Sequence, residues 1–210
     1  MRVISVATAY GVFCSLSTAS AQVSAAPAPG SAWIASVVVA HNSFDGASRD
    51  ASSVPGAVIS LQPGNHLGVS VSLARRIGLW ELALGLGYLT TNLEADGDGV
   101  NLLYETEPWR RLRAELLLAR RLVRLGQGAL LLSAGPTLDS WETGSFEGSV
   151  VAGGRAQLSL VLPLGGRLSL ENRAGIGWSG SPFTENDTPA GVERKSLRTL
   201  ELGAGLRVRL

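Results

Sequence analysis

The stretch LELGAGLRVRL, residues 200–210, decides the fold of this chain. Every even-numbered residue in it is leucine, alanine or valine, and every odd-numbered residue is glycine, glutamate or arginine. Because side chains alternate between the two faces of a strand, this pattern gives one apolar and one polar face. Its length matches the ~9–11 residues of a tilted membrane strand. Arg207 and Arg209 lie opposite the leucines, so their face is predicted to line a polar lumen.

The same alternation recurs upstream, although not equally clearly in every segment. It is good in 67–74, 79–89, 154–163 and 167–178, the last with Asn172 as a misfit on its apolar side. Residues 129–138 alternate except that Leu131 falls on the polar side. Residues 33–41 are apolar on both faces, so the pattern does not assign their orientation.

The segment 108–121 is open to two interpretations. Pro108 near its start and a run of strong helix formers favour a helix. At about 100° per residue, however, its arginines and leucines interleave and leave no apolar stripe. At period two, the apolar residues separate from the charged ones: Leu112, Ala114, Leu116 and Leu118 against Arg111, Arg113 and Glu115. We therefore favour a strand, which brings the number of strands to eight.

The connections between these runs alternate in length. Long stretches at 42–56, 90–107 and 179–194, with a loop near 140–148, alternate with the shorter 75–78, 122–128 and 163–166. Bacterial barrels have tight periplasmic turns and larger outer loops, whereas a soluble sandwich has no reason to keep this order. The sequence therefore predicts an all-β, eight-stranded antiparallel up-and-down transmembrane β-barrel over residues 33–210, with both ends on the periplasmic side.

The first residues have the features of an export signal. Arg2 precedes an uncharged run, Val3–Leu16, and Ala19 and Ala21 are small, so we expect a signal peptide at 1–21 with cleavage after Ala21. A retained N-terminal anchor is the alternative. Residues 22–32 are rich in Ala, Pro and Ser and predict a flexible leader. The one cysteine, Cys14, lies in the signal, so no disulfide is expected.

The charge balance bears on possible partners. Of 18 basic and 17 acidic residues, cleavage removes only Arg2, which leaves 17 of each and no reason to expect nucleic-acid binding. No later window approaches the ~18 apolar residues of a spanning helix. A membrane protein without such helices is a closed barrel, because lipid offers no partner to unpaired backbone groups. A soluble periplasmic β-protein is the alternative.

By these strands and connections, residues 33–210 resemble the small eight-stranded outer-membrane barrels of the OmpA transmembrane-domain and OmpX type. Residues 200–210 look like the signal read by the barrel-assembly machinery, but they end in Leu210 where that family usually has an aromatic residue. The resemblance implies the outer membrane of a Gram-negative-type envelope, with lipid and the assembly machinery as partners. We expect a monomer.

The predicted inner face is highly charged for a small barrel. Its charged residues are Glu81, Arg111, Arg113, Glu115, Arg155, Arg167, Glu171, Arg173, Glu201, Arg207 and Arg209. An eight-stranded barrel is just wide enough for side chains to fill it, and buried charges must pair. The set predicts either a salt-bridged plug or a narrow, porin-like path for ions.

The most specific local motif lies in residues 94–105. Glu94, Asp96, Asp98 and Glu105 occupy positions one, three, five and twelve of an EF-hand-type calcium loop, with Gly99 at position six. Position one is glutamate instead of aspartate, position eight is polar, and strands are expected on both sides. The alternative is a solvated acidic turn.

The aromatic residues predict two girdles at the membrane interfaces. Trp33 and Trp80 fall at the predicted periplasmic strand ends, and Tyr88, Trp109, Trp141 and Trp178 at the outer ends. The alternative is that they lie in the core of a soluble protein.

An enzymatic role has a weak basis in the sequence. Barrels of this size include lipid A deacylases and acyltransferases, and His41-Asn42-Ser43 with Asp45 lies where the first strand meets its outer loop. These residues match no deacylase motif, and we assign no catalytic residue. Three function classes follow: a structural or surface-interaction barrel, which we favour, a narrow ion-conducting pore, and a lipid A-modifying enzyme.

Overall fold

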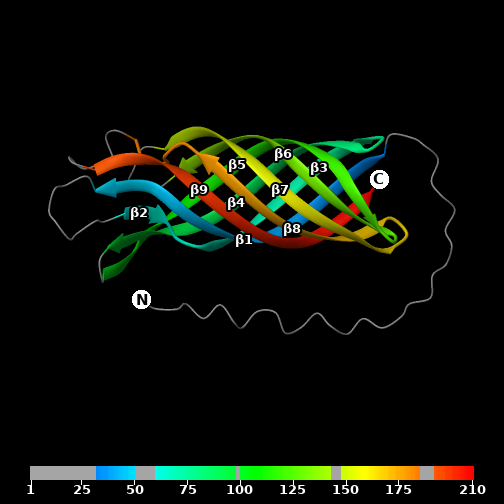
Figure 1. Cartoon of the computed structure of the whole chain (residues 1–210). Helices are drawn as coiled ribbons and strands as arrows, with labels where there is room; N and C mark the ends of the chain where they lie inside the picture. The colour runs from blue at the N-terminus through cyan, green and yellow to red at the C-terminus, as the bar shows by residue number, and fades with distance from the viewer. Residues whose placement is uncertain (1–31, 51–59, 98–99, 143–147, 185–191) are drawn as a thin grey trace.

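The computed structural model describes residues 32–50, 60–97, 100–142, 148–184 and 192–210 (Figure 1). The strands are β1 (Trp33–Asp50), β2 (Ser60–Pro63), β3 (His66–Ile77), β4 (Trp80–Gly97), β5 (Val100–Leu125), β6 (Gly128–Glu142), β7 (Ser149–Gly165), β8 (Leu168–Ser179) and β9 (Val192–Arg209). The predicted signal peptide, 1–21, lies outside the described residues, as does the leader except for Ala32.

The strands form one closed antiparallel cylinder. Each of β3 to β8 pairs with the next strand along the chain, and β1 pairs with both β3 and β9. The short β2 pairs with β1 and β4, the same two neighbours that β3 has, so β2 and β3 share one position in the sheet. The predicted eight-stranded antiparallel barrel is therefore confirmed.

The segment with helix-forming residues is part of the longest strand. β5 runs from Val100 to Leu125 and pairs along its length with β4 and β6. Its side chains alternate as a strand requires: Glu115 is 5% exposed and Leu116 is 45% exposed. Periodicity therefore predicts this segment correctly, and helix propensity does not.

Two-residue turns join the strands at one end of the barrel, which we call the turn end. They are Gly78–Leu79, Gly126–Gln127 and Gly166–Arg167, and their glycines have φ of 64°, 62° and 53°. Positive φ is readily adopted only by glycine, so these residues suit tight hairpins. The connection predicted at 122–128 is shorter than expected, because β5 continues to Leu125 and only Gly126–Gln127 form the turn.

At the opposite end, which we call the outer end, the strands extend further than predicted. The expected long loop at 90–107 is a hairpin instead, in which β4 continues to Gly97 and β5 begins at Val100. β1 and β9 also remain paired out to Asp50 and Val192. The strands are tilted around the barrel and project from its outer end (Figure 1).

The outside of the barrel carries an apolar band. On β5 the outward residues Leu112, Leu116 and Leu118 are about half exposed and lie between Arg110 and Arg120. On β1, Val38 points inward at 1% exposed, while Val37 and Val39 point outward, which assigns the orientation that the sequence leaves open. The described residues contain no helix that is long and apolar enough to span a membrane.

Candidate functional site: an ion-paired lumen under an aromatic cap

The lumen is lined by polar side chains from every long strand. Nine of the charges predicted to lie inside are buried there, each at most 9% exposed: Glu81, Arg111, Arg113, Glu115, Arg155, Glu171, Arg173, Glu201 and Arg207. The other two, Arg167 and Arg209, are exposed at the turn end. Alternation along each strand is what turns these residues inward.

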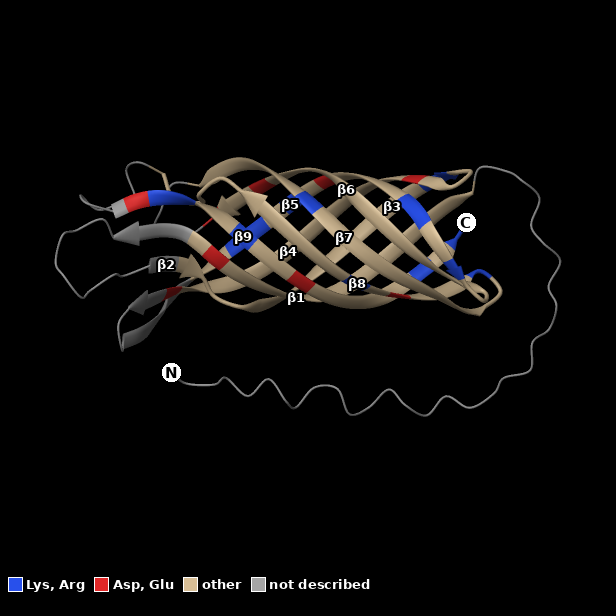
Figure 2. Ribbon diagram, in the orientation of Figure 1, with Lys and Arg blue, Asp and Glu red and all other residues tan. Residues whose placement is uncertain are grey.

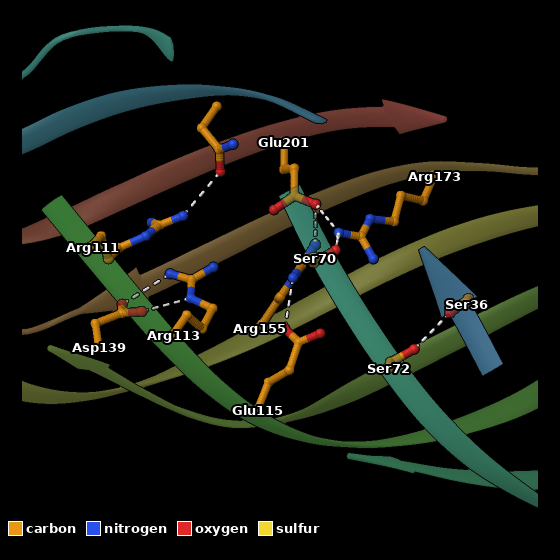
Figure 3. Close-up of polar contacts among 11 residues, drawn as sticks. Ser36, Ser70, Ser72, Arg111, Arg113, Glu115, Asp139, Arg155, Arg173 and Glu201 are labelled. Atoms are coloured by element: carbon orange, nitrogen blue, oxygen red, sulfur yellow. Dashed lines mark hydrogen bonds and ion pairs between the residues drawn. The ribbon is translucent and has the colours of Figure 1, made fainter. Parts of the chain in front are cut away.

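Arg155 on β7 is the centre of the largest network (Figure 3). Its Nη1 donates to Glu115 Oε2 on β5 at 2.7 Å, and its Nη2 donates to Glu201 Oε1 on β9 at 2.5 Å. Arg173 on β8 adds a second contact to Glu201 Oε1 at 2.8 Å and donates to Ser70 Oγ on β3 at 2.5 Å. Side chains from five strands are thus joined across the lumen.

A second layer lies toward the outer end. Arg113 binds Asp139 through two parallel hydrogen bonds, Nε to Oδ1 at 2.6 Å and Nη2 to Oδ2 at 2.9 Å. Arg111 Nη2 donates to Asn42 Oδ1 at 3.1 Å. Asp139 is absent from the predicted set, although it lies on the same face of β6 as the inward Leu131 and Ser133. Continuing the alternation past residue 138 identifies it.

A third layer closes the lumen toward the turn end. Glu81 accepts hydrogen bonds from Arg76 Nε, at 2.8 Å, and from Arg207 Nη2. Arg76 is also missing from the predicted set. Its pairing with Glu81 follows from the β3–β4 register, in which the two residues face each other beside a two-residue turn.

An aromatic cap covers the outermost part of the lumen. It consists of Phe44, Leu89, Trp109, Trp141, Phe183 and Leu197, all at most 6% exposed. The Trp141 ring centroid lies 6.1 Å from that of Trp109 and 5.9 Å from that of Phe44, edge to face. The Arg111 guanidinium carbon lies 5.2 Å from the Phe44 centroid and 5.5 Å from the Trp141 centroid. Arg111 therefore makes cation–π contacts with two rings of the cap.

The cap corrects the girdle prediction. The girdle prediction is wrong for Trp109 and Trp141, which point inward. Trp109 lies two residues from the inward Arg111, and Trp141 lies two residues from the inward Asp139, so each shares the inner face of its strand. The remaining four predicted girdle residues point outward and are 44–55% exposed: Trp33, Trp80, Tyr88 and Trp178.

Arginines stack on the two outward tryptophans at the turn end. The Arg75 guanidinium carbon lies 5.7 Å from the Trp33 ring centroid, and that of Arg120 lies 5.4 Å from the Trp80 centroid. Each pair faces across neighbouring strands. This edge of the apolar band therefore presents rings and cations together.

Little space remains between the charged layers. One cavity of about 20 Å³ lies among Arg111, Arg113 and Glu201, and another of about 40 Å³ lies among Glu81, Gln157 and Glu171. A water molecule requires roughly 10–15 Å³ of such space. These cavities therefore have room for one to a few water molecules each.

The predicted calcium ligands lie mostly outside what the structure describes. Glu94 is on β4, where its backbone pairs with Leu103 of β5. Asp98 lies outside the described residues, as do the side chains of Asp96 and Glu105. Among the residues whose side chains are described, no group of three or more His, Cys, Asp or Glu could hold a metal. Calcium binding by this segment stays a prediction.

The residues considered for catalysis point to different sides of the barrel wall. His41 is exposed on the outer surface, between Leu67 and Leu202 of the adjacent strands. Asn42 is 2% exposed and points into the lumen, where it binds Arg111.

Comparison with solved structures identifies the fold. Neisserial surface protein A superposes with a TM-score of 0.52 at 15% identity, covering 85% of this chain and 97% of that chain. The outer membrane protein OprG from Pseudomonas aeruginosa gives 0.61 at 11% identity, covering 87% and 97%. A major outer membrane protein from Thermus thermophilus gives 0.50 at 16% identity, covering 85% and 99%.

These similarities define the class of protein: the chain has the fold of the small eight-stranded outer-membrane β-barrels, and the predicted resemblance is confirmed at that level. No protein-family model matches the sequence, and no curated protein matches it significantly. At identities of 11–16% the comparison establishes the fold alone.

Proposed function

We propose that this chain is an integral outer-membrane protein whose closed barrel serves as a scaffold, with a structural or surface-interaction role at its outer end. The observation that carries the proposal is the filled lumen, in which Arg155, Arg113 and Glu81 each centre a paired layer beneath the aromatic cap. Cavities of about 20 and 40 Å³ suit one to a few isolated waters better than a continuous column of ions.

The outer end supports an interaction role. β1, β4, β5 and β9 continue beyond the apolar band, whose outer edge on β5 is marked by Arg110. Paired strands hold their backbone groups in hydrogen bonds, so these extensions form a rigid platform instead of separate loops. Such a platform suits contact with molecules outside the cell.

Planar-bilayer recording tests the closed barrel. The purified, detergent-folded chain should insert without unitary conductance steps. A variant that clears the central layer and part of the cap, E115A/R155A/E201A/W141A, should conduct under the same conditions, which shows that inserted barrels would have been detected. Steady conductance of the unaltered chain would contradict the proposal.

A narrow ion-conducting pore is the second candidate. It is favoured by the line of charges along the lumen, which includes Glu171 beside the larger of the two cavities and Arg173 in the central layer. If it is correct, the unaltered chain conducts and its conductance changes when Arg173 or Glu171 is neutralised.

We also propose that the chain is not an enzyme. The exposed His41 lies between leucines and points away from Asn42, which supports a rim residue over a general base. Lipid A from cells overexpressing the chain should have the same mass spectrum as lipid A from cells overexpressing His41→Ala. A change in the mass of lipid A that requires His41 would contradict this part of the proposal.

Export, assembly and oligomeric state complete the proposal. We infer cleavage after Ala21, recognition of residues 200–210 by the assembly machinery, and a monomer surrounded by outer-membrane lipid. Heat-dependent gel mobility of the detergent-folded chain tests the barrel, and the mass of the mature protein tests the cleavage site. A chain that stays soluble without detergent would contradict membrane insertion.

A further inference from the structure

The turn end of the barrel carries a concentration of positive charge, only part of which is paired in the lumen networks. Figure 2 shows basic residues gathered around the short turns. They surround a bowl of about 450 Å³, which we call the arginine bowl, and six arginines line it: Arg76, Arg121, Arg124, Arg167, Arg207 and Arg209. This volume falls within the ~300–1,000 Å³ typical of ligand pockets.

Few acidic side chains oppose these cations. No acidic residue lines the arginine bowl, and Glu81, which lies just below it, is already shared by Arg76 and Arg207. None of the described residues forms an ion pair with Arg121, Arg124, Arg167 or Arg209. The bowl therefore has a strongly positive balance.

Arg121, in the wall of the bowl, has a donor atom without a partner in the described part of the chain. It is half-buried, and its Nε is fully buried without a hydrogen-bond partner among the described residues. A buried polar atom without a partner costs free energy, which an anionic acceptor would recover. Gln127 and Ser169 also line the bowl and can add neutral donors.

We propose that the arginine bowl is a binding site for a multivalent oxyanion of the phosphate type. Guanidinium groups bind phosphate oxygens through paired, charge-assisted hydrogen bonds, and several converging arginines favour an anion with more than one charge. In barrels of this class the short turns face the periplasm, so the anion is either a soluble periplasmic phosphate compound or a phospholipid headgroup of the inner leaflet.

Titration with inorganic pyrophosphate tests the site. The detergent-folded full chain should bind pyrophosphate in calorimetry, more weakly as potassium chloride is raised. The turn-end variant R121Q/R124Q/R167Q should bind about tenfold more weakly or worse, since it loses several charge-assisted contacts. None of these three residues holds a lumen carboxylate, and heat-dependent gel mobility verifies that the variant folds.

A matched control distinguishes binding at the arginine bowl from a general effect of the net charge of the protein. R110Q/R194Q/R198Q removes the same charge from exposed outer-end positions and should bind pyrophosphate like the unaltered chain. If the unaltered chain does not bind pyrophosphate, or if both triple variants lose affinity equally, the proposal is wrong.

A second arm identifies the source of the phosphate group. The titration is repeated in nanodiscs of phosphatidylcholine, with and without phosphatidylglycerol. Competition by phosphatidylglycerol that the turn-end variant abolishes assigns the bowl to lipid headgroups. Unchanged pyrophosphate affinity assigns it to a soluble anion, and both outcomes support an oxyanion site.

Discussion

Arg155 illustrates what single residues contribute to this barrel. It is 3% exposed and lies between the carboxylates of Glu115 and Glu201, which are themselves buried. Withdrawing such charges from water costs nearly as much as their attraction returns, so the complete network adds little net stability. Removing one member is different, because it leaves the others buried without compensation.

Arg155→Met should therefore be strongly destabilising. Leaving two carboxylates without their shared cation should cost about 3–5 kcal/mol, measured by urea unfolding in lipid vesicles. The double variant E115Q/R155M should recover part of the loss, because the carboxylate that loses its partner is removed while Glu201 keeps its ion pair with Arg173. If Arg155→Met is as stable as the exposed substitution Arg110→Gln, the network does not carry the energy assigned to it.

At this scale the sequence predicts most of the charges that lie inside, misses Asp139 and Arg76, wrongly includes the exposed Arg167 and Arg209, and does not predict which charges meet. Alternation alone identifies Glu115, Arg155 and Glu201 as inward residues. Their pairing depends on the stagger between strands around the barrel, which no single strand encodes. The girdle prediction for Trp141 is wrong for a simpler reason: the face of this residue follows from counting along β6, whereas its position near a strand end suggests a girdle.

β5 shows how a whole element fits the membrane. Its outward leucines lie between Arg110 and Arg120, a spacing that matches the ~9–11 residues of a spanning strand. The inward face over the same length carries Arg111, Arg113 and Glu115. One strand therefore satisfies an apolar and a polar environment at once.

Position within this band sets the cost of an outward charge. Leu116→Arg should destabilise the barrel by about 2–4 kcal/mol, because it places a cation near the bilayer midplane. Leu122→Arg, near the turn end of the same strand, should cost about 0–1 kcal/mol. Urea unfolding in vesicles measures both. Equal losses of unfolding free energy in the two variants would mean that the apolar band is not centred on Leu116.

The sequence predicts strands well inside this band and poorly beyond it. Where one face meets lipid and the other a polar lumen, alternation is visible, as in residues 200–210. Beyond the membrane, in residues 90–107, apolar and polar residues no longer keep a sustained alternation, although the backbone pairing continues. The hairpin formed by the ends of β4 and β5 therefore reads as a long loop in the sequence.

For the whole molecule, the order of short and long connections predicts the number of strands. Every pair of neighbouring strands needs a connection, even where the alternation within the strands is weak. The aromatic cap could not be predicted in this way. Its members come from β1, β4, β5, β6, β9 and the segment after β8, and only the closed cylinder brings them together.

The pairing of β1 with β9 gives the strands a cyclic order in which none is first or last. At this seam the Leu210 backbone amide donates to the Trp33 carbonyl at 2.9 Å, so a short glycine-rich linker from Leu210 to Ala32 would act as one more tight turn. A circular permutant reopened between Gly126 and Gln127 should refold in vesicles with the parent's heat-dependent mobility. Failure to refold would mean that the order of synthesis, and not only the set of neighbours, specifies this cylinder.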